Sequence, residues 1–337
     1  LAPTLKEAFH IARSGRPGPV LVDVCKDVQF KSTDYDYDAI KLRLPGYRLK
    51  MRGMADQVRR AAALINAAQR PVILAGHGII LSGAHDQLRT LAEKGQIPVS
   101  TTLLGIGAMP ESHPMNLRMM GMHGEAFVNQ AIHHADLLIA LGMRFDDRVT
   151  GNLATYAQHA DVIHVDIDPA EIGKNVTTDV GIVGDARAVL EQLLPQVEER
   201  DRSGWFAQIA EWRTDSAARD IMTNGHDRAP HVPYVVDAIH RATRGQSATI
   251  VTDVGQHQMW TAQYYRHENR DRFLTSGGLG AMGYGVPAAM GAKFARPDDE
   301  VWAVVGDGGF QMSIPELATL AQENCSIKIA VMRNGYL

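Results

Sequence analysis

The C-terminal end of the chain contains the pattern that most restricts its fold. An apolar run at 301–305 predicts a buried strand, which stops at Gly-Asp-Gly-Gly (306–309), where backbone without Cβ atoms can approach a ligand closely. Ser313, three residues before Glu316, predicts a capped helix start. A second apolar run at 327–332 predicts the next strand. This order predicts two parallel strands of an open α/β sheet.

Two oxygen-bearing side chains, Asp307 and Asn334, follow these two predicted strands at equivalent ends. Ligands of open α/β sheets bind at the carboxyl ends of the strands. A carboxylate and an amide oxygen suit a magnesium ion that also holds phosphate oxygens. Because Gly-Asp-Gly alone is also an ordinary turn, the prediction of a magnesium and phosphate site rests on the spacing of the whole segment.

Length, composition and charge exclude several classes of protein. The 337 residues allow two to three domains, and 45% hydrophobic with 21% charged residues is typical of a globular protein. A net charge of −4 without a basic stripe argues against nucleic acid as a partner. We expect no membrane span, because no apolar run reaches about 18 residues. Two distant cysteines without a CxxC pattern indicate a reducing cytosol.

The alternation of apolar runs and helical periodicity predicts the α/β class, with two doubly wound parallel-sheet domains and the tail of a third. A helix at 4–13 and a strand at 20–25 cannot make a core alone, so we expect the chain to be a piece of a longer protein. The predicted division is a domain tail at 1–28, a linker at 29–54, a central domain at 55–185, bridging helices at 186–232 and a third domain at 233–337.

Glycines gather where a phosphate or nucleotide would lie. Residues 276–285 contain five glycines and enter a predicted helix at 286–294, where free N–H groups and the positive dipole end suit a phosphate. Asp166 and Asp168 close a strand, where they could accept ribose hydroxyls, although a loop cap is the commoner role of such an Asp. The 14 histidines lack partner ligands at zinc spacing, which argues against a zinc site.

Longer motifs resemble one family of thiamine-diphosphate enzymes. The segments at 121–124, RFDDRVTG (144–151) and 165–175 look like the flavin-binding domain of acetohydroxyacid synthase, also called acetolactate synthase. DVGQHQMW (253–260), residues 276–292 and residues 306–320 resemble its diphosphate-binding domain. The likeness covers nearly the whole chain, which is thereby identified as a member of this family and as part of its large, catalytic subunit.

The resemblance implies a set of site residues. Met282 would hold the cofactor bent, and Arg148 would bind the substrate carboxylate. Thiamine diphosphate would contact Val254, Gln256, His257, Gly280, Met282, Gly308 and Gly309. FAD would lie along Gly76, Gly78, Thr102, Leu103, Gly121, Met122, His123, Gly142, Arg144, Asp166 and Asp168. Mg²⁺ would be held by Asp307, Asn334 and the backbone carbonyl of Tyr336. Arg333 replaces the first of the family's two asparagines, and the glutamate that activates the cofactor is absent from the chain.

The implied reaction is the decarboxylation of pyruvate and its condensation with a second 2-keto acid, pyruvate or 2-ketobutyrate. This transferase step opens the biosynthesis of the branched-chain amino acids isoleucine and valine, and FAD would be structural. Implied partners are 2-keto acids, a second copy in a homodimer or homotetramer, and a regulatory small subunit. The implied location is the bacterial cytoplasm, with a plastid or mitochondrial form left open. Because the activating glutamate is absent, we expect the fragment alone to be inactive.

Two alternatives stay open. Glyoxylate carboligase, pyruvate oxidase and sulfoacetaldehyde acetyltransferase share the expected sheet and the Gly-Asp-Gly motif, although RFDDRVTG and GQHQMW favour the synthase. A non-catalytic paralogue that binds nucleotide or regulates a partner is the alternative from another class, and Arg333 and the truncation leave it open.

Overall fold

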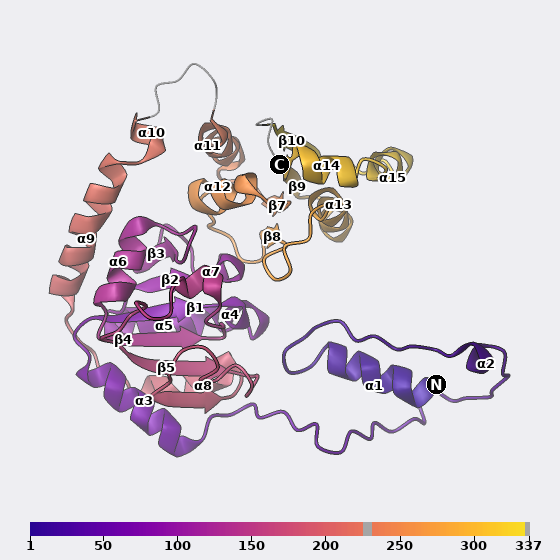
Figure 1. Ribbon diagram of the computed structural model, residues 1–337, viewed down its shortest axis with the longest axis horizontal. Helices are drawn as coiled ribbons and strands as arrows, with labels where there is room; N and C mark the ends of the chain where they lie inside the picture. The colour runs from indigo at the N-terminus through magenta and orange to yellow at the C-terminus, as the bar shows by residue number, and fades with distance from the viewer. Residues whose placement is uncertain (225–230, 334–337) are drawn as a thin grey trace.

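The computed structural model describes residues 1–224 and 231–333, in which two parallel sheets carry helices on both faces (Figure 1). The first sheet has six strands in the order β3-β2-β1-β4-β5-β6, the order of a dinucleotide-binding fold. Its strands are β1 (Pro71–Ala75), β2 (Val99–Thr101), β3 (Asn116–Met119), β4 (Leu137–Leu141), β5 (Asp161–Asp166) and β6 (Val180–Val183).

Side chains of the central strands alternate between two apolar cores, as the pleat of a strand requires. Val72 and Leu74 of β1 join the core on one face, and Ile73 and Ala75 join the core on the other. The first core contains α6 (Ala126–His134) and α9 (Ser203–Ala218), and the second contains α3 (Ala55–Ala67), α5 (His85–Gly95) and α8 (Ala186–Leu193). Burial on both faces explains why β1 and β4 are apolar throughout.

The second sheet has four parallel strands in the order β10-β9-β7-β8. The strands are β7 (Ala248–Thr252), β8 (Phe273–Thr275), β9 (Glu300–Gly306) and β10 (Lys328–Met332), and the helices are α11 (Val232–Thr243), α12 (Gln256–Tyr264), α13 (Gly285–Ala295), α14 (Asp307–Met312) and α15 (Glu316–Gln322). Gly306 pairs with Met332, so β9 and β10 end together as predicted. The predicted fold class, α/β with two doubly wound parallel sheets, is confirmed, whereas the domain boundaries stay a proposal.

Two local predictions are wrong. Residues 20–25 are extended but pair with no described strand, and Leu21 is 92% exposed. An apolar run becomes a strand only where a sheet edge accepts its hydrogen bonds. Ser313 does not cap α15, because its Oγ donates to the carbonyl of Gly309 at 3.3 Å and thus belongs to the end of α14.

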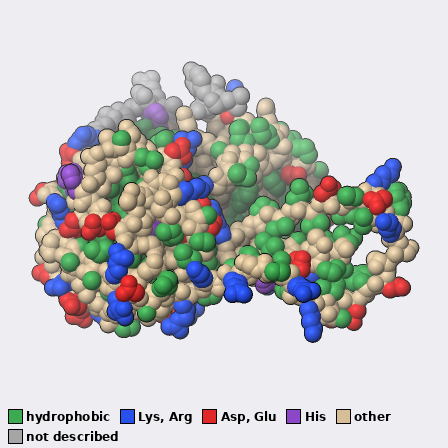
Figure 2. Space-filling model, turned by 60° about the horizontal axis from the view of Figure 1, so that its bottom comes forward, with side chains coloured by type: hydrophobic (Ala, Val, Ile, Leu, Met, Phe, Trp, Pro, Cys, Tyr) green, Lys and Arg blue, Asp and Glu red, His purple; other side chains and the backbone are tan. Residues whose placement is uncertain are grey.

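The N-terminal segment adds no strand to the two described sheets and contacts the first-sheet domain through Arg16. It contains α1 (Ala2–Ala12) and α2 (Lys26–Gln29), followed by irregular chain up to α3. Helix α1 has no buried residue, and Phe9 and Phe30 are 66% and 79% exposed. Figure 2 shows hydrophobic side chains on the surface of the projecting part at the right. Short helices elsewhere are α4 (His77–Leu81), α7 (Asp147–Thr150) and α10 (Ile221–Asn224), with 3₁₀ turns η1 (Leu103–Gly105) and η2 (Leu194–Gln196). Within residues 1–224 and 231–333, no helix is long and apolar enough to cross a membrane.

The two sheets are joined around the buried side chain of Glu111. Its backbone N–H donates to the carbonyl of His267 at 3.2 Å, and Ser112 Oγ donates to Glu268 Oε2 at 2.5 Å. Glu111 Oε2 lies 3.9 Å from Arg266 Nη1 and has no hydrogen-bond partner. Burial raises the pKa of Glu111 to about 8, although Arg118 and Arg266 oppose the shift.

Because burial raises the pKa of Glu111, we expect the stability of the protein to depend on pH. The folded protein holds the proton of Glu111 more tightly than the unfolded chain does. The contribution of this residue to the free energy of unfolding is therefore fully present below about pH 4.5 and is lost as the pH rises towards 8. Glu111→Gln keeps the neutral shape, so its melting temperature should exceed that of the parent at about pH 9 and match it at about pH 5. Differential scanning fluorimetry across this range measures the effect.

The matched control for Glu111→Gln is Glu93→Gln, which changes a half-exposed carboxylate of α5 that pairs with His113, two residues after Glu111. If both variants follow the pH profile of the parent protein, Glu111 is ionised in the folded state and the prediction is wrong.

Candidate functional site

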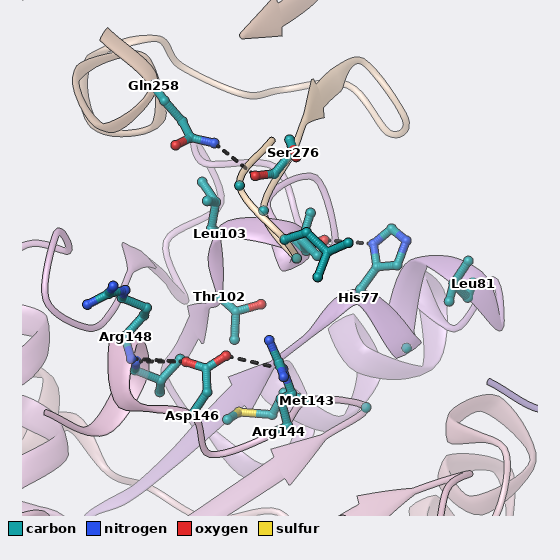
Figure 3. A pocket seen from close by; sticks show the side chains of 18 of the residues that line it. His77, Leu81, Thr102, Leu103, Met143, Arg144, Asp146, Arg148, Gln258 and Ser276 are labelled. Carbon is teal, nitrogen blue, oxygen red and sulfur yellow. Dashed lines mark hydrogen bonds and ion pairs between the residues drawn. The ribbon is translucent and has the colours of Figure 1, made fainter. Parts of the chain in front are cut away.

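One cavity of about 1730 Å³ lies between the carboxyl ends of both sheets. Its walls come from loops of the first sheet, from loops of the second sheet and from the N-terminal segment around Arg16 and Leu49. In the close view, Gln258 and Ser276 of the second-sheet part lie on one side of Leu103, and Arg144, Asp146 and Arg148 lie on the other (Figure 3). The two groups of residues that the resemblance implies therefore meet at a single cavity.

The residues expected to contact thiamine diphosphate all line this cavity. They come from three segments of the second sheet: the turn from β7 into α12, the glycine-rich loop at 276–285 and the turn from β9 into α14. The lining includes Val254, Gln256, His257, Gly280, Met282, Gly308 and Gly309, together with Asp307.

His257 offers an unused nitrogen to a ligand. The residue is 5% exposed, and burial lowers the pKa of its ring, which favours the neutral imidazole at pH 7. The ring is hydrogen-bonded to the backbone of Asp253, whereas Nε2 has no partner. A Cβ at Gly306 would stand 3.1 Å from the ring, so the glycine is needed here for packing. An unpaired buried polar atom is costly. In the neutral ring Nε2 is an acceptor, so it can donate to a phosphate oxygen only in the protonated ring, which the negative charge of a bound phosphate favours.

The glycine-rich loop is held differently from the prediction. The backbone N–H groups of Gly283 and Gly285 donate to the side chain of Asp253 at 3.1 and 2.8 Å. The prediction that the N–H groups of this loop are free for a phosphate is therefore wrong at these two positions. Gly277, Gly278 and Gly280 line the cavity. Asp253 was missed by sequence reasoning. Its position directly after a buried strand, like that of Asp307, is the pattern that could have marked it as a site residue.

Most of the residues that are expected to contact FAD lie on the wall of the cavity that the first sheet forms. Those that do are Gly78, Thr102, Leu103, His123, Gly142, Arg144 and Asp166, whereas Gly76, Gly121, Met122 and Asp168 are not among the lining residues. A Cβ on Gly78 would lie 2.6 Å from Gly142 Cα, because the first turn of α4 presses against the end of β4. Close backbone packing thus requires these glycines even without a ligand.

Asp168 is engaged by the N-terminal segment. Arg16 Nη1 contacts Asp168 Oδ2 at 3.2 Å and Glu171 Oε1 at 2.8 Å. Asp166 Oδ1 accepts the N–H of Asp168 at 2.8 Å, and burial raises the pKa of Asp166. Arg16 was missed by sequence reasoning, because no local pattern indicates an ion pair between segments so distant in the chain.

Arg148 belongs to a short helix that Asp146 fixes. Asp146 Oδ1 accepts the N–H groups of Arg148 and Val149 at 3.1 and 3.2 Å, which caps the N-terminus of α7. Asp146 Oδ2 lies 3.2 Å from Arg144 Nε (Figure 3). The Arg148 side chain is 69% exposed and lines the cavity, and its Nη1 lies 3.7 Å from Asp147 Oδ2 and 3.9 Å from Met122 Sδ. A largely exposed guanidinium at the cavity wall can bind a carboxylate.

Of the predicted magnesium ligands, the structure describes Asp307 alone. Its Oδ1 accepts the N–H of Gly308 at 3.2 Å, and its side chain lies on the cavity wall. Asn334 and Tyr336 lie outside the described residues. Among residues 1–224 and 231–333 there is no group of three or more His, Cys, Asp or Glu that could hold a metal ion. The magnesium site therefore stays a proposal.

Comparison with known proteins defines the class. Residues 58–193 match the family "Thiamine pyrophosphate enzyme, central domain", and residues 253–337 match "Thiamine pyrophosphate enzyme, C-terminal TPP binding domain". The first match contains the whole first sheet, and the second begins directly after β7 and contains the other three strands of the second sheet. The chain belongs to the thiamine pyrophosphate enzyme family.

Within that family, the chain is homologous to acetolactate synthase large subunits. It is 48% identical to the acetolactate synthase of Mycobacterium bovis, 47% to the large subunit of Corynebacterium glutamicum and 46% to the probable large subunit of Methanocaldococcus jannaschii. Each alignment covers 99% of this chain but 54%, 53% and 58% of these relatives. The chain thus spans about half the length of the curated relatives it matches.

Proposed function

We propose that the full protein is an acetolactate synthase, which decarboxylates pyruvate and joins the remaining two-carbon unit to a second 2-keto acid. The observation that carries the proposal is the single cavity, which is lined by His257 and Asp307 of the second sheet and by Arg148 of the first. The names of the relatives support the same reaction.

The residues present fit thiamine diphosphate. His257 would donate from Nε2 to the diphosphate in its protonated form, which the charge of the diphosphate favours, and Asp307 would provide the carboxylate for a magnesium ion that also holds phosphate oxygens. When bound, thiamine diphosphate supplies the electron sink for loss of carbon dioxide. Met282 offers an apolar side chain to the middle of the cofactor, and Arg148 orients the 2-keto acid through its carboxylate. The crevice of the first sheet takes FAD in a structural role.

The proposal extends to assembly and location. We infer a homodimer or homotetramer, a regulatory small subunit as partner and a bacterial cytoplasmic location. The "large subunit" in the names of relatives supports the small-subunit partner.

The decisive experiment identifies the product. The full protein is incubated with pyruvate, thiamine diphosphate, Mg²⁺ and FAD, and acetolactate is measured by its conversion to acetoin in acid. Acetolactate formation that requires thiamine diphosphate and Mg²⁺ is expected. Peroxide from pyruvate would indicate an oxidase, and tartronate semialdehyde from glyoxylate would indicate a carboligase. A protein that binds the cofactor but converts none of these substrates would be a non-catalytic paralogue.

A further inference from the structure

We propose that Asp253 is a positioning residue that assembles the diphosphate site before the cofactor arrives. Its side chain ties together three segments that are separate in the sequence: the end of β7, the glycine-rich loop before α13 and the turn after β9. The inference rests on the proposed function, because it assigns Asp253 to the same cofactor.

The hydrogen bonds of Asp253 define the tie. Asp253 follows β7 directly and has no exposed surface. Its Oδ1 accepts the N–H of Val254 at 2.7 Å and of Gly283 at 3.1 Å, and its Oδ2 accepts the N–H of Gly285 at 2.8 Å. Both carboxylate oxygens are therefore used, and the start of α13 is fixed to the end of β7.

The third segment is fixed by close packing against the same carboxylate. A Cβ on Gly309 would stand 2.6 Å from Asp253 Oδ1, so only glycine fits at this position. A Cβ on Gly285 would stand 3.1 Å from Asp253 Cβ. The turn at Asp307, Gly308 and Gly309 thus lies directly on the carboxylate that holds the glycine-rich loop.

Asp253 also sets the orientation of His257. The imidazole is hydrogen-bonded to the backbone of Asp253, and its Nε2 is a buried atom without a partner in a residue that lines the cavity. Every segment that offers a group to the diphosphate therefore contacts one residue that does not itself line the cavity.

The charge of Asp253 explains why a carboxylate is needed. No Lys or Arg within residues 1–224 and 231–333 pairs with it, so the backbone N–H groups alone compensate its charge. An ionised carboxylate only accepts hydrogen bonds, whereas Asn would point an NH₂ donor at one of these N–H groups. Burying a charge is costly unless it is hydrogen-bonded, so this carboxylate depends on the N–H groups of Val254, Gly283 and Gly285.

The test is Asp253→Asn in the full protein, with thiamine diphosphate affinity measured by calorimetry at saturating Mg²⁺. We expect binding at least about tenfold weaker, from the loss of a charge-assisted hydrogen bond. Hydrogen exchange of residues 276–285, measured without cofactor, is expected to be faster than in the parent protein. This second readout is independent of cofactor binding.

Asp299→Asn is the matched control. Asp299 is equally a buried aspartate of the second sheet, 7% exposed, but it lies before β9, where it accepts from Thr249 Oγ1 at 3.1 Å and pairs with Arg272. It should lower the melting temperature and leave cofactor affinity within about twofold.

The outcomes separate the inference from the proposed function. If the parent protein binds no thiamine diphosphate, the proposed function fails, and the assignment of Asp253 to this cofactor fails with it. If the parent binds and Asp253→Asn binds within about twofold of it, or if Asp299→Asn weakens binding equally, the positioning role is overturned while the proposed function stands.

Discussion

Asp307→Asn is expected to weaken Mg²⁺-dependent binding of thiamine diphosphate to the full protein by at least about a hundredfold. The substitution keeps the shape of the side chain and the bond to the N–H of Gly308, but removes the only carboxylate that the β9 turn offers to the cavity. Without that charge, the magnesium ion loses its anionic ligand, and the diphosphate loses its counter-charge. Calorimetric titration with and without Mg²⁺ measures the effect.

The control for Asp307→Asn is Asp298→Asn, an exposed aspartate before the opposite end of β9. It should bind the cofactor like the parent protein. Retention of Mg²⁺-dependent binding by Asp307→Asn would place the metal elsewhere. Raised Mg²⁺ concentration should partly restore binding if the carboxylate acts on the metal rather than on the fold.

Arg148→Lys is expected to raise the KM for pyruvate about 10- to 100-fold while the affinity for thiamine diphosphate stays unchanged. Lysine keeps the charge but cannot form the two parallel hydrogen bonds that a guanidinium gives to a carboxylate. Asp146 holds the backbone of Arg148 in the α7 cap, so the substitution alters the side chain without moving the helix. Steady-state kinetics of acetolactate formation measure the change.

Asp147→Ala is the matched control for Arg148→Lys. Asp147 is 77% exposed and contacts Arg148 at 3.7 Å, an exposed ion pair of little energetic weight. It should leave KM within about twofold of the parent. A fall in kcat with unchanged KM in Arg148→Lys would contradict carboxylate binding and indicate a role in a later step.

The two sheets were largely predictable because their central strands are buried on both faces. The apolar runs of β1, β4, β5 and β7 needed no knowledge of distant contacts. Short β3, β6 and β8 were not predicted, because three or four residues carry too little periodicity. The strand predicted at 20–25 is wrong because an apolar run does not reveal whether a partner strand exists.

The candidate site was predictable where a motif is local. Asp307 was predicted from the spacing of its segment, whereas His257 and Arg148 were predicted from the family resemblance of theirs. All three line one cavity. The salt bridges from Arg16 to Asp168 and Glu171 join segments far apart in the chain. The role of Asp253 likewise depends on a loop 30 residues away. Such contacts follow from the fold rather than from local pattern.

The shared cavity has a consequence for modular redesign. Because its walls come from both sheets, no single half of the chain carries a complete specificity. On the proposed assignment, a chimera could take residues 231–333 from one relative and the first sheet from another. Its affinity for thiamine diphosphate would then come from the first parent and its binding of the substrate carboxylate from the second. Exchanging halves would therefore separate two traits that natural variants inherit together.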